Sequence, residues 1–264
     1  MQPLILKSYP KLNIFLKIIG RRSDGFHLLS SRFVLAKGAL FDTISIESSS
    51  TGFVLEGEFG CKLESNTIYK AKCAIKELAQ NKYKDSHLVA CIESLKVCVQ
   101  KRIPEGAGLG GGSANAASFV HGVCNLYHIS LDTQDYAYIA QRCGADVAFF
   151  LHRYESANVG GIGEEVIAFE ETLPEFEIFT PQILCSTPAV YKAYATHTTN
   201  FSPLPTQWLN TKSTQILQSH TLQELNDLYM SACYVAPELE SLRKDLGSGW
   251  FFSGSGSSFF RPKL

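Results

Sequence analysis

The strongest constraint in this sequence is a glycine-rich stretch at residues 104–118, Pro-Glu-Gly-Ala-Gly-Leu-Gly-Gly-Gly-Ser-Ala-Asn-Ala-Ala-Ser. Five of the nine residues from 104 to 112 are glycine: Gly106, Gly108, Gly110, Gly111 and Gly112. Glycine adopts positive φ angles at little cost, so such a stretch can turn several backbone N–H groups into one concavity. The stretch therefore predicts a loop that binds an anion.

Small and apolar residues then recur at three- and four-residue spacing, which predicts a helix that starts at the glycines. The members of this pattern are Ser113, Ala114, Ala117, Val120, Cys124 and Tyr127. The positive end of the helix dipole would face the loop, and a polyphosphate is the expected occupant. A flexible linker is a weaker interpretation, because linkers seldom lead directly into an alanine-rich helix.

Two other glycine signatures fit this stretch less well. Gly106, Gly108 and Gly111 spell the dinucleotide fingerprint G-x-G-x-x-G, which also needs an acidic residue about twenty positions later, at the end of a second strand. Asp132 has about that spacing, but residues 131–143 have the pattern of a helix, so Asp132 is predicted to be an N-cap. The P-loop pattern fails because no Gly-Lys-Ser/Thr follows the glycines.

The composition is that of a globular protein, with 264 residues, 45% hydrophobic and 19% charged, and a formal net charge of −1. This length suits one large or two modest domains. The near-neutral charge disfavours broad binding to nucleic acid or to an anionic membrane. No apolar run is long enough to span a membrane, and Lys7, Lys11 and Lys17 interrupt any signal-peptide pattern. We therefore expect a cytoplasmic protein.

The eight cysteines and seven histidines show no metal-binding spacing. The sequence contains no C-x-x-C and no H-E-x-x-H, so no metal site built from the protein's own side chains is expected. The cysteines are predicted to be buried free thiols in a reducing compartment.

Periodicity predicts a mixture of strands and helices. The predicted strands are residues 11–19, 42–47, 95–102, 177–185 and 250–252, and the predicted helices are residues 67–80, 113–127, 131–143, 188–194 and several across 204–245. Lys11 and Asn13 share one face of the first strand, and Asn66 stands at the N-cap of the first helix. The element pattern changes near residue 155, which predicts two domains, 1–154 and 155–264.

Two further segments carry polar groups in unusual surroundings. Asp146 leads an otherwise apolar run, residues 144–151, and this context desolvates its carboxylate. Such a group is either a structural hydrogen-bond acceptor or a functional base, and the local sequence leaves both open. Residues 253–258, Ser-Gly-Ser-Gly-Ser-Ser, form a second small-residue loop, which by itself could be an ordinary hairpin.

Three separated segments together resemble the three motifs of the GHMP kinase superfamily. They are Pro-Lys-Leu-Asn-Ile-Phe-Leu (10–16), the glycine-rich stretch, and Gly-Ser-Gly-Ser-Ser (254–258). Within that superfamily the chain is most similar to the kinases of 4-diphosphocytidyl-2-C-methyl-D-erythritol, from the non-mevalonate isoprenoid pathway. This closer resemblance rests on residues 20–27, 66–71 and 144–147 and on Thr187-Pro188-x-x-Tyr191, and it covers nearly the whole chain.

The resemblance implies a two-domain α+β fold. The N-terminal domain would be like domain 2 of ribosomal protein S5, followed by a C-terminal α+β domain, with ATP and substrate in the cleft between them. The implied reaction transfers the γ-phosphate of ATP to the 2-hydroxyl of the cytidylated methylerythritol. Mg²⁺ would be held mainly by the nucleotide phosphates, and the partners would be ATP and this small-molecule substrate.

The resemblance also implies roles for individual residues. Asp146 matches the family's catalytic base, and Lys11 matches the lysine beside it. A hydroxyl is a poor nucleophile, so a carboxylate must accept its proton while a cation holds the base and the γ-phosphate in place. Substrate contacts would come from Asn13 and Asp146, with the cytosine ring stacked by Phe26 and Tyr191 and its edge hydrogen-bonded by His27. Nucleotide contacts would come from Asn66, Lys101, Pro104, Gly106, Ala107, Gly108, Leu109, Gly110, Gly111, Gly112, Ser113 and Ala114.

The chain departs from the family pattern at a few positions. Pro10 stands where alanine is commoner, Phe26 replaces a tyrosine, and Ala148 replaces the proline that follows Gly-Ala-Asp-Val. None of these changes removes a charge or donor that the chemistry needs. The family usually continues with a further helix and strand after the position of Ser258, so we expect a second domain shortened at its end.

Three alternative functions remain to be weighed. A kinase of mevalonate or homoserine is disfavoured by Phe26, His27 and Tyr191, which suit a pyrimidine better than an acyclic acid. A catalytically silent nucleotide-binding module would be expected to have lost Lys11 or Asp146. A dinucleotide oxidoreductase is disfavoured by the helix predicted at residues 131–143.

Overall fold

The computed structural model describes residues 2–198, 200–201, 203 and 206–263. The chain forms two compact units. Unit 1 consists of Met1–Pro10, Ala39–Glu105 and Gly111–Arg153, and unit 2 consists of Lys11–Gly38, Gly106–Gly110 and Tyr154–Leu264. The chain passes from unit 1 to unit 2 for the last time at Tyr154, next to the predicted domain boundary. The two units nevertheless differ from the two predicted domains. Strands early in the chain pair with a strand late in the chain and therefore belong to unit 2.

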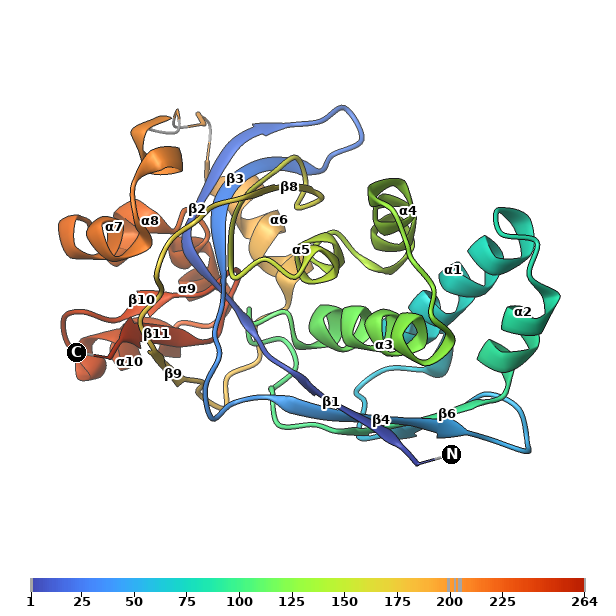
Figure 1. Ribbon diagram of the computed structural model, residues 1–264. Helices are drawn as coiled ribbons and strands as arrows, with labels where there is room; N and C mark the ends of the chain where they lie inside the picture. The colour runs from blue at the N-terminus through green and yellow to red at the C-terminus, as the bar shows by residue number, and fades with distance from the viewer. Residues whose placement is uncertain (1, 199, 202, 204–205, 264) are drawn as a thin grey trace. The chain divides into compact units, whose positions relative to one another are not determined.

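Unit 1 contains a four-stranded sheet in the order β1-β4-β6-β5. The strands are β1 (Leu4–Ser8), β4 (Asp42–Ser48), β5 (Val54–Gly57) and β6 (Leu95–Gln100), and only the β5–β6 pair is parallel. Alternate residues of β4 and β6 are buried, which matches the period of a sheet with one packed face. That face is covered by α3 (Gly111–Tyr127), as Figure 1 shows. The approach is close at Gly122, where an added Cβ would lie 2.4 Å from Ile46 Cδ1.

The remaining helices of unit 1 are η1 (Leu63–Ser65), α1 (Thr67–Asn81), α2 (Ser86–Glu93), α4 (Thr133–Cys143) and α5 (Val147–His152). Two predicted N-caps are confirmed. Asn66 accepts a hydrogen bond from the backbone N–H of Ile68 at 2.9 Å. Asp132 and Asp135 form a reciprocal capping box at the start of α4. Asp132 is thus a cap, as expected, and not the ribose ligand of a dinucleotide fold.

Unit 2 contains two antiparallel sheets. One has the order β2-β3-β7-β8 and consists of β2 (Lys11–Arg21), β3 (His27–Leu35), β7 (Ser156–Gly160) and β8 (Glu165–Ala168). The other has the order β10-β11-β9 and consists of β9 (Phe176–Phe179), β10 (Phe251–Phe252) and β11 (Phe259–Pro262). Residues 253–258 join β10 to β11, so this loop is indeed the turn of a hairpin.

The strand predicted at residues 177–185 is shorter than expected. β9 ends at Phe179, which pairs with the first residue of β11, Phe259; the next N–H along, that of Ser258, donates to the Ala107 carbonyl instead. The helices of unit 2 are α6 (Thr187–His197), η2 (Thr206–Asn210), α7 (Ser213–Ser219), α8 (Leu222–Leu225), α9 (Tyr229–Val235) and α10 (Glu238–Leu246). Of these, α6 and α9 pack on each other.

A buried arginine of β3, Arg32, links η2 to the first sheet of unit 2. The Arg32 guanidinium, which is fully buried, lies 3.4 Å from the Glu171 carboxylate and 3.5 Å from the centre of the Phe169 ring. It also donates to the backbone carbonyls of Trp208 and Leu209 at 3.2 and 3.0 Å. These contacts satisfy the guanidinium, as a buried charge requires.

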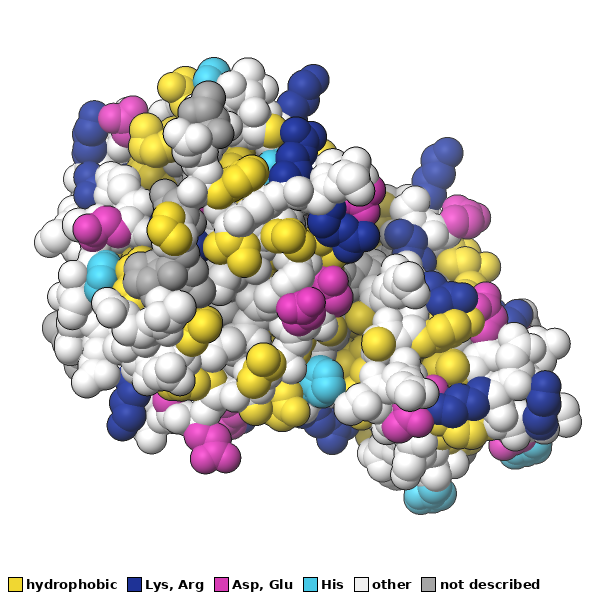
Figure 2. All heavy atoms as spheres, turned by 90° about the horizontal axis from the view of Figure 1, so that it is seen from above, with side chains coloured by type: hydrophobic (Ala, Val, Ile, Leu, Met, Phe, Trp, Pro, Cys, Tyr) yellow, Lys and Arg dark blue, Asp and Glu magenta, His cyan; other side chains and the backbone are white. Residues whose placement is uncertain are grey.

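The eight cysteines are free thiols, as predicted. The expectation that all are buried is wrong: Cys61 is exposed and only Cys143, Cys185 and Cys233 are fully buried. Cys61 lies in the loop before η1, within a run of exposed residues, 60–65. Among the described residues, no helix combines the length and the hydropathy needed to cross a membrane. Figure 2 shows charged side chains of both signs scattered among hydrophobic and uncharged ones.

Candidate active site

The glycine loop is shaped by hydrogen bonds to its carbonyl groups. Three consecutive carbonyl oxygens, those of Ala107, Gly108 and Leu109, accept from Ser258 N (3.1 Å), Ser253 Oγ (3.0 Å) and Lys11 N (2.9 Å), respectively. All of these residues belong to unit 2. The donors come from β2 and from the β10–β11 turn, which are the other two segments of the resemblance. The three motifs therefore meet at the loop.

The loop leaves its amides available. Gly106, Gly108 and Gly110 have φ angles of 66°, 72° and 69°. Within the part of the chain that the structure describes, the N–H groups of Gly108, Leu109 and Gly110 donate no hydrogen bond. Fixed carbonyls and unpaired amides on a backbone with alternating positive φ are the features of an anion-binding nest.

The next residue along the chain, Gly111, begins α3 in unit 1. Gly112, Ser113 and Ala114 form the first turn of this helix, whose amides are unpaired by geometry and whose dipole is positive there. Thr67 Oγ1 donates to the Gly112 carbonyl at 2.7 Å and so links the start of α1 to this turn. The first turn of α3 is therefore a second group of amides suited to an anion.

Lys101 is anchored by a residue that the sequence did not single out. Its ammonium group pairs with the fully buried carboxylate of Asp42. The same carboxylate accepts from the backbone N–H groups of Arg102 and Ile103, at 2.6 and 2.8 Å, and from Asn115 Nδ2 at 2.9 Å. Asp42 thus joins the end of β6 to the first turns of α3. The sequence signal that could have identified Asp42 is an acidic residue at the start of an otherwise apolar strand.

Lys11 and Asn13 lie together on one face of β2, as predicted. Lys11 is 4% exposed; its Nζ donates to Asn13 Oδ1 at 2.5 Å and lies 4.6 Å from the centre of the Phe33 ring. Asn13 Nδ2 donates in turn to Ser31 Oγ at 3.0 Å. A buried ammonium group held by an amide oxygen has a fixed position.

Asp146 stands directly before α5, half-buried, after Gly144 with a φ of 145°. Its side chain does not cap α5, although it occupies the N-cap position. The commonest structural use of an acid at this place is therefore not made here. The apolar run that follows it is buried in α5, as the sequence pattern suggested.

The predicted base-binding residues lie at the β2–β3 turn and on α6. Phe26 is 60% exposed, so it is not a core aromatic. The imidazole of His27 is buried and contacts two tyrosine rings of α6, with centroid distances of 5.4 Å to Tyr191 and 5.6 Å to Tyr194. Burial, and then the charge of Arg21, lowers the pKa of His27 and so favours the neutral ring. Tyr194 was not predicted; its spacing of three from Tyr191 on a helix is the signal that could have found it.

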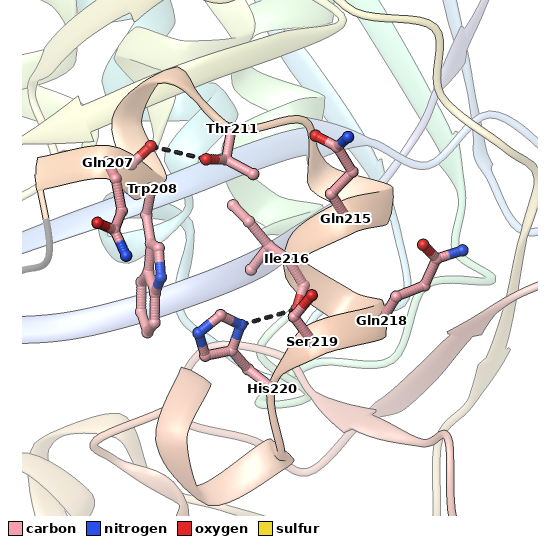
Figure 3. A pocket seen from close by; sticks show the side chains of 8 residues that line it. All are labelled: Gln207, Trp208, Thr211, Gln215, Ile216, Gln218, Ser219 and His220. Carbon is pink, nitrogen blue, oxygen red and sulfur yellow. Dashed lines mark hydrogen bonds between the residues drawn. The ribbon is translucent and has the colours of Figure 1, made fainter.

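A surface pocket of about 440 Å³ also lies on unit 2, beside η2 and α7 (Figure 3). It is lined by Gln207, Trp208, Thr211, Gln215, Ile216, Gln218, Ser219 and His220. None of the predicted site residues lines it. Within the described part of the chain, no group of three or more His, Cys, Asp or Glu side chains could hold a metal ion.

Known proteins resemble this chain over nearly its full length. The family described as GHMP kinases N terminal domain matches residues 66–154. A 4-diphosphocytidyl-2-C-methyl-D-erythritol kinase of Helicobacter acinonychis (strain Sheeba) is 39% identical, covering 97% of this chain and 95% of that one. The protein of the same name from Sulfurovum sp. (strain NBC37-1) is 42% identical, with 98% of both chains covered.

Solved structures agree with the sequence relatives. The crystal structure of a 4-(cytidine 5'-diphospho)-2C-methyl-D-erythritol kinase has a TM-score of 0.76 and 30% identity, covering 98% of this chain and 90% of that one. The Methanococcus jannaschii mevalonate kinase has a TM-score of 0.58 at 12% identity, covering 100% and 91%, and so shares the fold. These neighbours establish the two-domain α+β GHMP fold. The chain belongs to the family of 4-diphosphocytidyl-2-C-methyl-D-erythritol kinases, within the GHMP kinases.

Proposed function

We propose that this protein transfers the γ-phosphate of ATP to the 2-hydroxyl of 4-diphosphocytidyl-2-C-methyl-D-erythritol, in non-mevalonate isoprenoid biosynthesis. The observation that carries the proposal is an identity of about 40% to kinases of that name over nearly the whole chain. The fold and the three meeting motifs support it. As a family member the protein is an ATP-dependent kinase of a small molecule; the identity of the acceptor hydroxyl and the residue roles below belong to the proposal.

The nucleotide phosphates bind the amides of the glycine loop and of the first turn of α3. Gly108, Leu109 and Gly110 offer backbone N–H groups without an acceptor among the described residues, and Gly112, Ser113 and Ala114 offer those of a helix N-terminus. Preorganised amides of this kind stabilise negative charge that develops as the phosphoryl group transfers. Mg²⁺, held mainly by the nucleotide phosphates, would neutralise part of that charge.

Asp146 acts as the general base. Its carboxylate accepts the proton of the 2-hydroxyl while the hydroxyl oxygen bonds to the γ-phosphorus, and the bond from that phosphorus to the ADP oxygen breaks. Lys11 supplies a fixed positive charge, because Asn13 and the Phe33 ring hold its ammonium group in place. Asn66 and Lys101 complete the nucleotide site. The Lys101 ammonium has three donors, so pairing with Asp42 leaves others for a ligand.

The cytosine base binds at Phe26, His27 and Tyr191. The exposed Phe26 ring offers a face for stacking, and Tyr191 lies beside the imidazole of His27 on the neighbouring α6. A neutral imidazole carries one donor and one acceptor, so it can pair with a base edge that presents both kinds of group. Action in the cytoplasm, where ATP is abundant, stays a prediction.

A coupled assay of ADP release tests the proposal directly. The purified protein would be given ATP, Mg²⁺ and, separately, the cytidylated methylerythritol, mevalonate or homoserine at equal concentration. We expect turnover with the cytidylated substrate alone. Comparable turnover with mevalonate or homoserine would instead favour a kinase of another GHMP type, whose solved relatives share this fold at only 12 to 17% identity.

A further inference from the structure

Asn226 follows α8 directly and is buried, at 3% exposure. Its Nδ2 donates to the carbonyls of Phe252 and Gly254, each at 3.0 Å, and its Oδ1 accepts from the backbone N–H of Leu228 at 2.9 Å. A side-chain amide has two N–H donors, so both are used. The two carbonyls belong to the residues on either side of Ser253. Asn226 thus fixes the backbone around that serine.

Ser253, itself fully buried, transmits this constraint to the glycine loop. Its hydroxyl donates to the Gly108 carbonyl at 3.0 Å and accepts from the Asn13 backbone N–H at 3.4 Å. The packing is close: a Cβ added to Gly108 would lie 2.1 Å from the Ser253 carbonyl oxygen. A small shift of Ser253 therefore displaces Gly108.

The adjacent residue, Asp227, holds β2 in the same way. Its Oδ2 accepts from the Ile18 backbone N–H at 2.8 Å, its backbone N–H donates to the Leu16 carbonyl at 3.0 Å, and its carboxylate pairs with Lys17. β2 begins at Lys11, whose N–H holds the Leu109 carbonyl. The two consecutive residues 226 and 227 therefore anchor both segments that clamp the loop. Neither Asn226 nor Asp227 belongs to any of the three motifs.

We propose that Asn226 is a positioning residue for ATP: through Ser253 it sets the shape of the glycine loop, and so the affinity of the loop for the nucleotide phosphates. The proposal rests on the assignment of the glycine loop to ATP made above. The side-chain hydrogen bonds of Asn226 go to residues 228, 252 and 254, and not to the proposed cytosine-binding residues, which lie on β3, α6 and the β2–β3 turn. Its loss should therefore affect one substrate and not the other.

The test compares Asn226→Ala with Asn158→Ala. Asn158 is a matched control in unit 2, because its side-chain amide also makes structural hydrogen bonds. It donates to the Leu209 backbone carbonyl at 2.9 Å and accepts from the Arg32 side chain at 2.7 Å. For Asn226→Ala we expect the KM for ATP to rise about tenfold or more, with the KM for the cytidylated substrate within about twofold of wild type. Asn158→Ala should lower the melting temperature and leave both constants unchanged. An unchanged KM for ATP, or an equal rise in both constants, would refute the proposal.

A double mutant tests the route through Ser253. If Asn226 acts through that hydroxyl, the double mutant Asn226→Ala, Ser253→Ala should raise the KM for ATP no more than the stronger single substitution does. If the two residues act independently, the fold-increases in KM of the single mutants would multiply. Multiplying effects would refute the route. If Asn226→Ala does not fold, Asn226→Asp serves instead, because it keeps the shape and the acceptor and loses both donors.

The same series separates the two proposals. Gly110→Val tests whether the glycine loop binds ATP at all. Loss of ATP binding in Gly110→Val with a normal KM in Asn226→Ala would overturn the role of Asn226 alone. Normal ATP binding in both variants would overturn the assignment of the loop.

Discussion

The ammonium group of Lys101 and the carboxylate of Asp42 form a buried ion pair in unit 1, with Nζ and Oδ2 2.5 Å apart. The Asp42 side chain is fully buried and that of Lys101 is 10% exposed. Removing one partner would leave a charge uncompensated, so we expect Lys101→Met to lower the free energy of unfolding by about 3 to 5 kcal/mol. Lys37→Met is the control, because the Lys37–Glu155 pair is more than half exposed and should contribute about 1 kcal/mol or less. Denaturant titrations that give equal losses would contradict this account.

Asp146→Asn should lower kcat by about two to four orders of magnitude while leaving ATP affinity nearly unchanged, because it removes a proton acceptor and keeps the shape. Asp132→Asn is the control, since Asn caps a helix nearly as well as Asp does. Turnover would be followed by ADP release and affinity by calorimetry. A variant that kept a tenth of wild-type turnover would rule out Asp146 as the base.

Gly110→Val should abolish or severely weaken ATP binding, because a β-branched residue opposes the φ of 69° and its side chain enters the phosphate concavity. Gly247 provides the comparison: it has a φ of 79° at the end of α10, with open space around an added Cβ. Gly247→Val carries similar backbone strain and should bind ATP normally. Titration with a non-hydrolysable ATP analogue distinguishes the two variants. An equal loss of affinity in both variants would show that backbone strain, and not the nest, is its cause, and normal affinity in Gly110→Val would show that the loop does not bind the phosphates.

Phe26→Ala and Tyr191→Ala should each weaken binding of the cytidylated substrate by roughly five- to 150-fold, which corresponds to about 1 to 3 kcal/mol of base stacking. Phe26 is mostly exposed, so its loss should leave the melting temperature nearly unchanged. Tyr234→Ala, which removes another exposed ring, is the control. His27→Ala should reduce the preference for cytosine over uracil, because the polar edge of the base would lose its hydrogen-bond partner. A normal KM for the substrate in both aromatic variants would defeat the cytosine-site assignment.

The stability of the protein should fall as the pH drops from 6.5 toward 4, and His121 should account for part of that loss. Burial, and then the charge of Arg153, lowers the pKa of His121 to about 4. Below pH 6.5 the unfolded chain binds a proton that the folded chain does not, so folding becomes less favourable by up to roughly 3 kcal/mol. His121→Gln can still donate to the Phe150 carbonyl, which lies 3.3 Å from His121 Nε2, but does not titrate. Unfolding free energies at pH 7 and pH 4.5 should differ less in this variant; equal differences would contradict the assignment.

The sequence alone determined the features that depend on neighbours along the chain. The helices at residues 67–80 and 131–143 and their caps at Asn66 and Asp132 were predictable, because capping and helical periodicity are local. The pairing of Lys11 with Asn13 on one face of β2 follows from the two-residue period of a strand. The family was also recognisable, since three separated motifs together are far more specific than any one of them.

Tertiary structure decided which distant segments act together. Ser253 and Asn226 carry no local mark of their roles, because each holds backbone groups more than 25 residues away. Sheet pairing likewise placed β2 and β3 in unit 2, against a simple cut of the chain near residue 155. A buried carbonyl or amide must find a partner wherever the fold provides one. That requirement is met in three dimensions, and a one-dimensional pattern does not reveal it.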